Sequence, residues 1–583
     1  MDSVTNKDRL TLIHNAKIYA FDEADYSWML FDNKSGYIRA LGRRDPPIND
    51  ATPDNVIDVN GRRVLPGLHE SHIHLGLYGL TLTYLDASGC RSVDELKERL
   101  LIFAKNNPNR KWIHGHGWEQ DQLGRYPARA DLDCVCPDQP VLLFRVCGHI
   151  AVANSKALQL AGIGRNTPDP EGGRIDRYPE GHSLCGEPTG VIREVSEKLF
   201  AEFLIPTETD MSSAIKESIR HCLKQGVTSV HALEDHYTWG IFCDLVDQGR
   251  LPVRVFYVPY WENRKSQKIP EAGQTRGKLL SCDRVKIFSD GALGPCTAAV
   301  SVPYKGSDKN NKGLLMHTQD DLNKLVSEAT SSGYRLEIHA IGDAAADAVL
   351  TSLEAGKVAR EKRPIIVHCQ ILRTDLIERM DSLGVIASIQ PQFVPTDARW
   401  VGDVLPEDLM EYAYAWKTLI NSNIQCCGGS DAPVESPRPL RGIYDAIFRY
   451  TDDNRKTCYR SDQCLTVQEA ITLYTKGGAF TTRREHDLGQ LLPGFQADFI
   501  VLDSEIDPVQ CPEEFSTTKV SQDRIASEEM FKLNQINLRT SQETKIEVLI
   551  TMMLCRSTDP ANIIVQVTIQ MREKGRQPEV VRK

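Results

Sequence analysis

No apolar run in this sequence reaches the length that a membrane-spanning helix needs, and residues 1–8 show no apolar core of a signal peptide. Basic residues are also fewer than acidic ones, with 69 Lys and Arg against 79 Asp and Glu. The formal net charge is -10 and the pI is about 5.9, which argues against nucleic acid as a partner. The 16 cysteines form no C-x-x-C pair, so neither a zinc knuckle nor a thioredoxin-like motif is indicated. We therefore expect a cytoplasmic protein with reduced thiols and no membrane or nucleic-acid partner.

What is present is a globular composition, with 41% hydrophobic and 25% charged residues among 583. Strand-like apolar runs alternate with segments of helical periodicity through the middle of the chain. Eight such runs lie at 64–69, 228–232, 253–258, 285–288, 336–339, 365–368, 385–390 and 424–428. Repeated strand–helix units predict a parallel sheet of the α/β class. Eight of them fit a closed (β/α)8 TIM barrel, with an insertion at about residues 85–205 after the first strand.

A His-x-His pair stands at the end of the first of these runs. Residues two apart on a strand point to the same face, so the imidazoles of His72 and His74 can meet at one point. Neutral imidazole is the commonest protein ligand for a transition metal. The run 69–72 is not the helical HExxH motif of metalloproteases, because it is one residue too short. The pair therefore predicts a metal site on a strand.

Further chemically active side chains close later strands and precede loops. They are Lys286, His339, His368 and Asp431. In a parallel barrel the carboxyl ends of all strands open onto one face, where active sites lie. Histidines, a lysine and an aspartate gathered there describe a metal centre better than any other chemistry.

Lys286 is the unusual member of this set. A protonated ammonium has no acceptor and would repel a divalent cation. One interpretation is a lysine with a depressed pKa, or one that carbon dioxide has converted to a carbamate, an oxygen ligand able to bridge two metals. The other is a strand lysine whose ammonium reaches solvent. Spacing alone leaves both open.

In the order in which they occur, these motifs resemble the amidohydrolase superfamily, and within it the YtcJ-like branch that includes N-substituted formamide deformylases. The resemblance covers roughly residues 10–503. It is carried by Pro66-Gly67 with His72-Ile73-His74, Val285-Lys286-Ile287-Phe288-Ser289-Asp290-Gly291, His339-Ala340-Ile341-Gly342-Asp343, His368-Cys369-Gln370, Gln390-Pro391-Gln392, Gly429-Ser430-Asp431-Ala432-Pro433-Val434-Glu435 and Pro493-Gly494-Phe495-Gln496-Ala497-Asp498.

The resemblance implies a metal-dependent hydrolase barrel at 67–486 beside a small β-sandwich built from both chain ends, 1–66 and 487–520. It leaves 521–583 as a divergent tail of unknown structure. The implied metal ligands are His72, His74, carboxylated Lys286, His339, His368 and Asp431, with Asp431 also the catalytic proton shuttle. Trp118 and His149 are similar to family positions near the substrate pocket. Zinc is the first expectation, as one or two ions, with iron and manganese open.

Two departures from the family pattern are visible. Pro295-Cys296 stands where the family commonly has a Ser-Arg pair, which bears on substrate contacts. The chain after about Thr518 does not look like the family's closing strand, so we expect the sandwich to be incomplete or differently finished.

The predicted function is hydrolysis of a non-peptide carbon–nitrogen bond in a small-molecule amide, with an N-substituted formamide as one candidate, by metal-activated hydroxide. An ester, cyclic imide or deamination reaction of the same superfamily stays open, because specificity lies in loops. An inactive barrel scaffold is the third hypothesis. It predicts missing ligands, and none of the six is missing. A homodimer also stays open.

Overall fold

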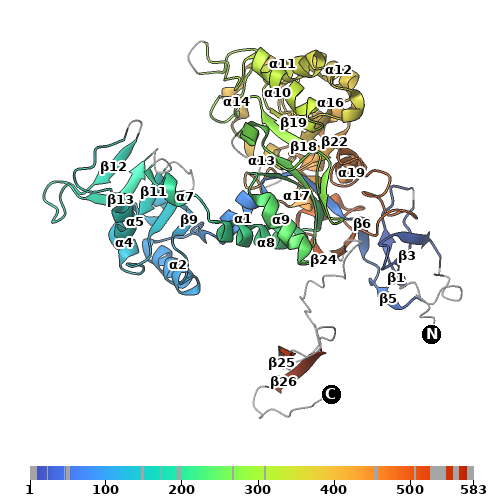
Figure 1. Cartoon of the computed structure of the whole chain (residues 1–583), viewed down its shortest axis with the longest axis horizontal. Helices are drawn as coiled ribbons and strands as arrows, with labels where there is room; N and C mark the ends of the chain where they lie inside the picture. Colours follow the sequence, from blue (N-terminus) through green and yellow to red (C-terminus); the bar gives the residue numbers. More distant parts are fainter. Residues whose placement is uncertain are drawn as a thin grey trace. The chain divides into compact units, whose positions relative to one another are not determined.

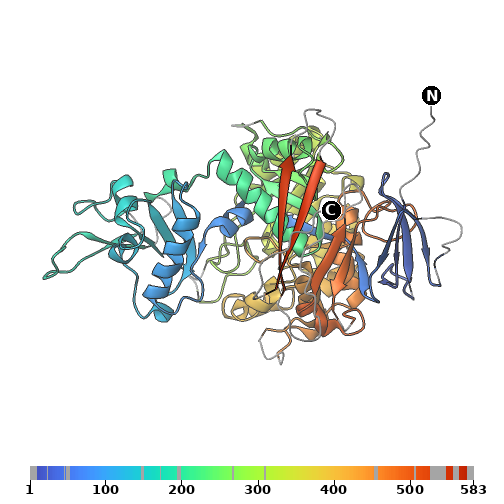
Figure 2. The same ribbon diagram turned by 90° about the horizontal axis from the view of Figure 1, so that it is seen from below.

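The computed structural model describes residues 10–22, 24–44, 46, 53–145, 150–170, 173–193, 199–265, 268–306, 310–451, 457–504, 507–524, 546–555 and 564–573. The chain divides into two compact units, Met1–Lys532 and Leu533–Lys583. The second unit contains one antiparallel hairpin of β25 (Ile546–Cys555) and β26 (Ile564–Glu573), drawn in red in Figure 2. No helix in the described part of the chain combines the length and apolar character that crossing a bilayer requires.

Two small sheets lie at the ends of the first unit. One has the order β4-β3-β1-β5 and comes from the N-terminal segment alone. Its strands are β1 (Leu10–His14), β3 (Trp28–Asp32), β4 (Ile38–Gly42) and β5 (Asn55–Asp58). The other has the order β2-β6-β23-β24 and joins both ends of the chain. Its strands are β2 (Lys17–Ile18), β6 (Arg63–Pro66), β23 (Phe499–Asp503) and β24 (Lys519–Arg524).

These two sheets share an apolar core. Phe31 of β3 and Phe499 of β23 are buried, with ring centroids 6.0 Å apart. β24 pairs antiparallel with β23, so a strand does follow Thr518 and this sheet is not left without one there. The sequence signal was weak because β24 is short and polar, Lys-Val-Ser-Gln-Asp-Arg. Its Val520 packs into the large apolar core that also contains Val227 of β14 and Val285 of β18, and not into the core shared by the two small sheets.

Two five-stranded sheets have the orders β16-β17-β15-β14-β7 and β18-β19-β20-β21-β22. All neighbours in them pair parallel except β16, which pairs antiparallel with β17. The strands of the first are β7 (Leu68–Ile73), β14 (Val227–Glu234), β15 (Arg254–Pro259), β16 (Gln274–Arg276) and β17 (Leu280–Cys282). Those of the second are β18 (Arg284–Phe288), β19 (Arg335–Ala340), β20 (Ile365–His368), β21 (Ile386–Ile389) and β22 (Cys426–Gly428). Isolated parallel bridges connect the sheets at both edges, Tyr260↔Lys286 and Ile73↔Ala432.

Helices separate these strands along the chain and cover them. They include α1 (Leu75–Thr83), α8 (Glu208–Lys224), α9 (Thr238–Asp247), α10 (Gln319–Ser331), α11 (Asp343–Ala355), α12 (Thr374–Leu383) and α17 (Pro439–Phe448). Helices α10 and α11 both pack on β19 (Figure 1). All positions of β7 and β14 are buried, as expected for parallel strands covered on both faces.

The predicted first strand, 64–69, is divided in the structure. Its first half is β6, which pairs with β23, and its second half begins β7, which pairs with β14. Gly67 lies at the break, where an added Cβ would stand 2.3 Å from Thr228 Oγ1. The continuous apolar run 64–69 thus contributes strands to two different sheets.

The segment after α1 forms a separate six-stranded sheet, with the order β12-β13-β11-β10-β9-β8. Its strands are β8 (Leu85–Asp86), β9 (Ile113–Trp118), β10 (Val141–Arg145), β11 (Ile150–Ala153), β12 (Arg174–Arg177) and β13 (Pro188–Arg193). Helix α2 (Val93–Asn106) shares an apolar core with it, through residues such as Leu96 and Leu143. This part of the chain therefore has a core of its own.

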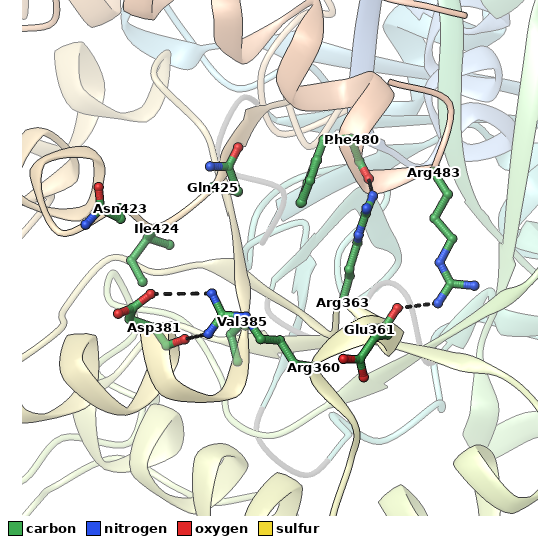
Figure 3. A pocket seen from close by; sticks show the side chains of 11 residues that line it. Arg360, Glu361, Arg363, Asp381, Val385, Asn423, Ile424, Gln425, Phe480 and Arg483 are labelled. Carbon is green, nitrogen blue, oxygen red and sulfur yellow. Dashed lines mark hydrogen bonds and ion pairs between the residues drawn. The ribbon is translucent and has the colours of Figure 1, made fainter. Parts of the chain in front are cut away.

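A hollow of about 600 Å³ lies where β20, β21 and β22 begin (Figure 3). The guanidinium of Arg363 lies 3.8 Å from the centroid of the Phe480 ring in its wall and donates to the Phe480 carbonyl. Arg360 and Arg483 in the same wall donate to backbone carbonyls of Asp381 and Glu361. The hollow shares no residue with the candidate metal ligands; two of these, His368 and Asp431, lie at or beyond the other ends of β20 and β22.

Candidate metal centre

His72, His74 and Asp431 form one group of side chains that could hold a metal ion. One ligand atom from each lies within 4.8 Å of the others. Asp431 Oδ1 is 3.3 Å from His74 Nε2 and 3.5 Å from His72 Nε2. The bridge between Ile73 and Ala432 explains the approach, because it aligns the end of β7 with the loop after β22.

Hydrogen bonds on the far side of each imidazole set which nitrogen faces the group. His72 Nδ1 lies 2.8 Å from Glu337 Oε1, so the ring donates there and Nε2 keeps its lone pair. His74 Nδ1 lies 2.8 Å from the Tyr260 hydroxyl, which leaves Nε2 toward Asp431. Asp431 Oδ1 is buried and has no hydrogen-bond partner among the described residues. A nitrogen lone pair facing an unsatisfied carboxylate oxygen is favourable when a cation lies between them, so this donor set fits a divalent metal.

Lys286 lies in the middle of β18 and is fully buried, so its nitrogen does not reach solvent. Its Nζ is 3.5 Å from His72 Nε2. Burial lowers the pKa of Lys286 to about 8, although the charges of Glu337 and Asp431 act in the opposite direction. An amine with this pKa is partly neutral near physiological pH.

His339 and His368 extend the group. Their ring centroids are 4.5 Å apart, and the His368 ring is 5.7 Å from that of His72. His339 Nε2 lies 2.9 Å from the carbonyl oxygen of Gly291, which leaves Nδ1 as the nitrogen able to bind a metal. His368 Nδ1 lies 3.0 Å from Gln390 Oε1, which leaves Nε2. All six predicted ligands thus lie in one chain of close contacts.

Backbone geometry holds two of these residues in an uncommon conformation. His368 has φ 77° and Asp431 has φ 56°, in the left-handed region that non-glycine residues rarely adopt. Glu70 connects the loops: its Oε1 accepts the backbone N–H groups of Ser430 at 2.7 Å and of His72 at 3.3 Å. The carboxylate of Glu70 therefore fixes the Asp431 loop against the His72 strand.

The ionisation of the group suits metal binding. Burial is the main cause that lowers the pKa of His72 and of His368 well below the usual value, with Lys286 and His339 adding to it respectively. Burial acts to raise the pKa of Asp431, but the neighbouring side chains of His74 and His72 outweigh it and the pKa is lowered. Neutral imidazoles beside a carboxylate are the forms that bind a metal.

The structure does not bring Trp118 to this centre. Its side chain is fully buried in the core of the six-stranded sheet, and its Nε1 donates to the Leu143 carbonyl at 2.8 Å. The indole is an apolar anchor of β9 with its polar atom satisfied. His149, the other residue predicted near the substrate, lies outside the described residues.

Sequence reasoning missed the residues that orient the ligands, namely Glu337, Tyr260 and Glu70. A signal was present for Glu337, because a carboxylate interrupts the apolar strand Leu336-Glu337-Ile338 and shares the face of His339, two positions on. Tyr260 carries no comparable signal, since it directly follows β15 as an ordinary aromatic residue.

The parallel sheets and this donor set define a metal-dependent hydrolase of the α/β class. A family model described as the amidohydrolase family matches residues 55–525, and the chain belongs to this family. The resemblance drawn from the motifs is thereby confirmed, and the chain is a hydrolase acting on carbon–nitrogen bonds.

Individual relatives agree with this assignment. The chain is 35% identical over 467 residues to the amidohydrolase-type protein YtcJ of Bacillus subtilis, covering 78% of this chain and 87% of YtcJ. It is 26% identical over 526 residues to the N-substituted formamide deformylase of Arthrobacter pascens, covering 86% and 94% of the two chains. The crystal structure of an uncharacterized metal-dependent hydrolase from Pyrococcus furiosus matches with a TM-score of 0.70 and 30% identity, over 86% of this chain and 100% of the other. These likenesses imply the metal-dependent hydrolase type of TIM barrel and support a divalent metal.

Proposed function

We propose that the protein hydrolyses the amide bond of a small non-peptide molecule at a divalent metal centre held by His72, His74 and Asp431. The observation that carries this proposal is the buried Oδ1 of Asp431, which has no hydrogen bond among the described residues and faces two imidazole Nε2 atoms at 3.3 and 3.5 Å. Lys286, His339 and His368 complete the proposed ligand set. A divalent ion bound there supplies Lewis acidity, which acidifies a water molecule and polarises the substrate carbonyl.

Asp431 is the proposed proton shuttle. Its lowered pKa keeps it a carboxylate at neutral pH, ready to accept a proton from the attacking water. The protonated acid then donates that proton to the leaving nitrogen of the amide. The Glu337 carboxylate and the Tyr260 hydroxyl hold the imidazoles of His72 and His74 in one orientation during this exchange.

Lys286 fits the centre best as a carbamate. Its neutral amine would attack carbon dioxide, forming a nitrogen–carbon bond and losing one proton. The product places an anionic oxygen ligand where an ammonium would repel the metal. The complete burial of Lys286 beside His72 supports this, because a permanent positive charge there has little solvation. Zinc is the proposed metal, and elemental analysis distinguishes it from iron and manganese.

We infer that eight parallel strands of these two sheets, namely β7, β14, β15 and β18 to β22, close into one (β/α)8 barrel. The bridges Tyr260↔Lys286 and Ile73↔Ala432 support closure, because they join the residue after β15 to β18 and the loop after β22 to β7. Closure places the carboxyl ends of the strands, and therefore all six ligands, at one mouth.

Formamides are the first substrates to test, because a relative that matches over most of both chains is named N-substituted formamide deformylase. A panel of N-formyl and N-acyl amines, with an ester, a cyclic imide and an aminopyrimidine as comparisons, separates amide hydrolysis from the other reactions of the superfamily. Turnover confined to the last three compounds would reject the amide assignment.

Asp431→Asn tests the shuttle. We expect the variant, assayed after loading with excess metal, to lose on the order of a thousandfold in kcat/KM, because the proton can no longer move through this side chain. The exposed Asp403→Asn on α14 (Val401–Val404) is the matched control and should behave as wild type. Unchanged turnover by a metal-loaded Asp431→Asn protein would reject the role.

A further inference from the structure

Cys458 and Cys464 bring two thiols together at a place that the hydrolytic reaction does not use. Their sulfur atoms lie 3.6 Å apart, and both residues are half-buried rather than sealed in the core. We propose that Cys458 and Cys464 form a reversible disulfide, a redox modification site in the segment after α17. The proposal is independent of the substrate assigned above.

The backbone holds both cysteines in place from either side. Cys458 is bridged to Tyr450 in an antiparallel pair, and the next residue, Tyr459, donates its N–H to the Arg449 carbonyl at 2.9 Å. On the other side Leu465 donates its N–H to the Ala446 carbonyl of α17, also at 2.9 Å. The two thiols are therefore close together because the backbone on either side of them is fixed by hydrogen bonds.

Only a small movement of the two sulfur atoms is needed to form the disulfide. A disulfide has a sulfur–sulfur distance of about 2.05 Å, so the sulfurs must approach by about 1.5 Å. Rotation about the cysteine side-chain torsions, with a small shift of the intervening turn η3 (Ser461–Gln463), provides a displacement of this size. The closed loop spans 458–464 and is short.

A small disulfide, glutathione disulfide, is the oxidant of the two thiols. Burial, with Cys458 beside it, raises the pKa of the Cys464 thiol to about 12, so Cys464 is a poor first nucleophile. Cys458 thiolate attacks one sulfur of glutathione disulfide, forming a mixed disulfide and releasing one glutathione thiolate. Cys464 then loses its proton and displaces the second glutathione. In total two electrons and two protons pass from the cysteine pair to two molecules of glutathione.

The bond would close a strap, residues 458–464, that is held by hydrogen bonds against the segment carrying Ala413 and Tyr414. Within the strap, Arg460 donates to the Ala413 carbonyl at 2.9 Å, and Arg449, which contacts the strap through the Tyr459 carbonyl, donates to the Tyr414 carbonyl at 3.1 Å. The Tyr414 hydroxyl in turn donates to Asp397 at 2.7 Å. Oxidation thus fixes the segment on which the position of Tyr414 depends.

Peptide mapping tests the proposal on the full chain. Trypsin cleaves after Lys456, Arg460 and Lys476, which places the two cysteines on separate peptides, 457–460 and 461–476. After incubation with glutathione disulfide we expect these peptides to be joined in the mass spectrum and to separate on treatment with dithiothreitol. Two fewer thiols per chain should then react with a thiol reagent.

Matched variants decide the outcome. Cys458→Ser and Cys464→Ser should each abolish the joined peptide, whereas Cys243→Ser, which removes another half-buried thiol on α9, should leave it unchanged. The proposal is overturned when wild-type protein yields the two peptides unlinked, either unmodified or each carrying glutathione. It is equally overturned when the joined species contains a different cysteine in place of Cys458 or Cys464.

Discussion

At the scale of single residues, the candidate metal centre depends on charged side chains that are buried. Glu337 is fully buried, accepts from His72 and has its second oxygen 3.6 Å from the guanidinium of Arg284. A buried carboxylate of this kind fixes the tautomer of a ligating histidine and increases its basicity. The metal site therefore includes a residue that is not itself a proposed ligand.

Glu337→Gln should weaken metal retention by about 10- to 100-fold, because a neutral amide can still meet His72 Nδ1 but no longer increases its basicity. The measurement is metal per chain after dialysis against graded chelator concentrations, which does not rely on catalysis. Glu354→Gln, an exposed position on α11, is the control and should retain metal as wild type does. Equal retention by Glu337→Gln would show that the contact is dispensable.

Asp397 predicts a pH dependence of stability. Burial raises its pKa to about 6, although Tyr414 and Gln370 hydrogen-bond to it and act in the opposite direction. The native state keeps this proton up to about pH 6, whereas the unfolded chain loses it near pH 4, so this group's contribution to stability falls as pH rises from about 4 to 6. Asp397→Asn removes this decrease in stability, because the amide does not titrate.

The stabilising effect of Asp397→Asn should therefore be small at pH 4 and largest at pH 7, reaching at most about 3 kcal/mol. Urea midpoints of variant and wild type across this range give the measurement. Asp244→Asn, exposed on α9, should show no such trend. A constant difference between Asp397→Asn and wild type would contradict the assignment.

Most of the candidate ligands could be predicted from the sequence because they stand where an apolar run ends, whereas Lys286 lies within β18 and was linked to them by its motif. Spacing alone suggested that His72 and His74 share a face, and the motif order linked them to His339, His368 and Asp431. The supporting contacts could not be predicted in this way. Glu337 and His72 are 265 positions apart, so their meeting depends on the path of the whole sheet and not on any local pattern.

At the scale of elements, the first helix after the metal pair is held in place by close packing. Helix α1 begins directly after His74 and packs closely on α8. A Cβ at Gly79 would stand 2.0 Å from the Ala214 carbonyl oxygen, which belongs to the backbone and cannot move away easily. This close packing fixes where α1 lies and thereby where His74 is held.

Gly79→Ala should destabilise the protein by about 1–3 kcal/mol, because the two helices must separate. Gly240→Ala in α9 is the matched control: no atom lies within 4 Å of its added Cβ, so it should stabilise by about 0.5–1 kcal/mol. Thermal unfolding of the two variants measures both effects. Equal midpoints would show that the α1–α8 contact yields without cost.

Element boundaries were harder to predict than element types. The apolar run at 64–69 gave no indication that it changes sheets, since both halves are buried and hydrophobic. Pairing partners more than a hundred residues away decide where the run divides. Similarly, β24 was missed because its local sequence is polar and its position comes from pairing with β23.

At the scale of the whole molecule, the two compact units predict different tolerance to truncation. A chain ending at Lys532 retains β24 and should keep the thermal midpoint of the first unit within about 2 °C. A chain ending at Thr518 loses β24, including the buried Val520, and should unfold several degrees lower. Calorimetry of both chains gives the comparison. A large loss on removing only 533–583 would show that the second unit stabilises the first.

The pairing of β6 with β23 also has a consequence for synthesis on the ribosome. Val64 and Val501 are register partners, so the first strand leaves the exit tunnel about 440 residues before the second exists. At 5–20 residues per second the early strand waits roughly 20–90 s with its apolar face uncovered. During that interval a nascent chain of this protein should be a client for chaperones that hold exposed hydrophobic segments.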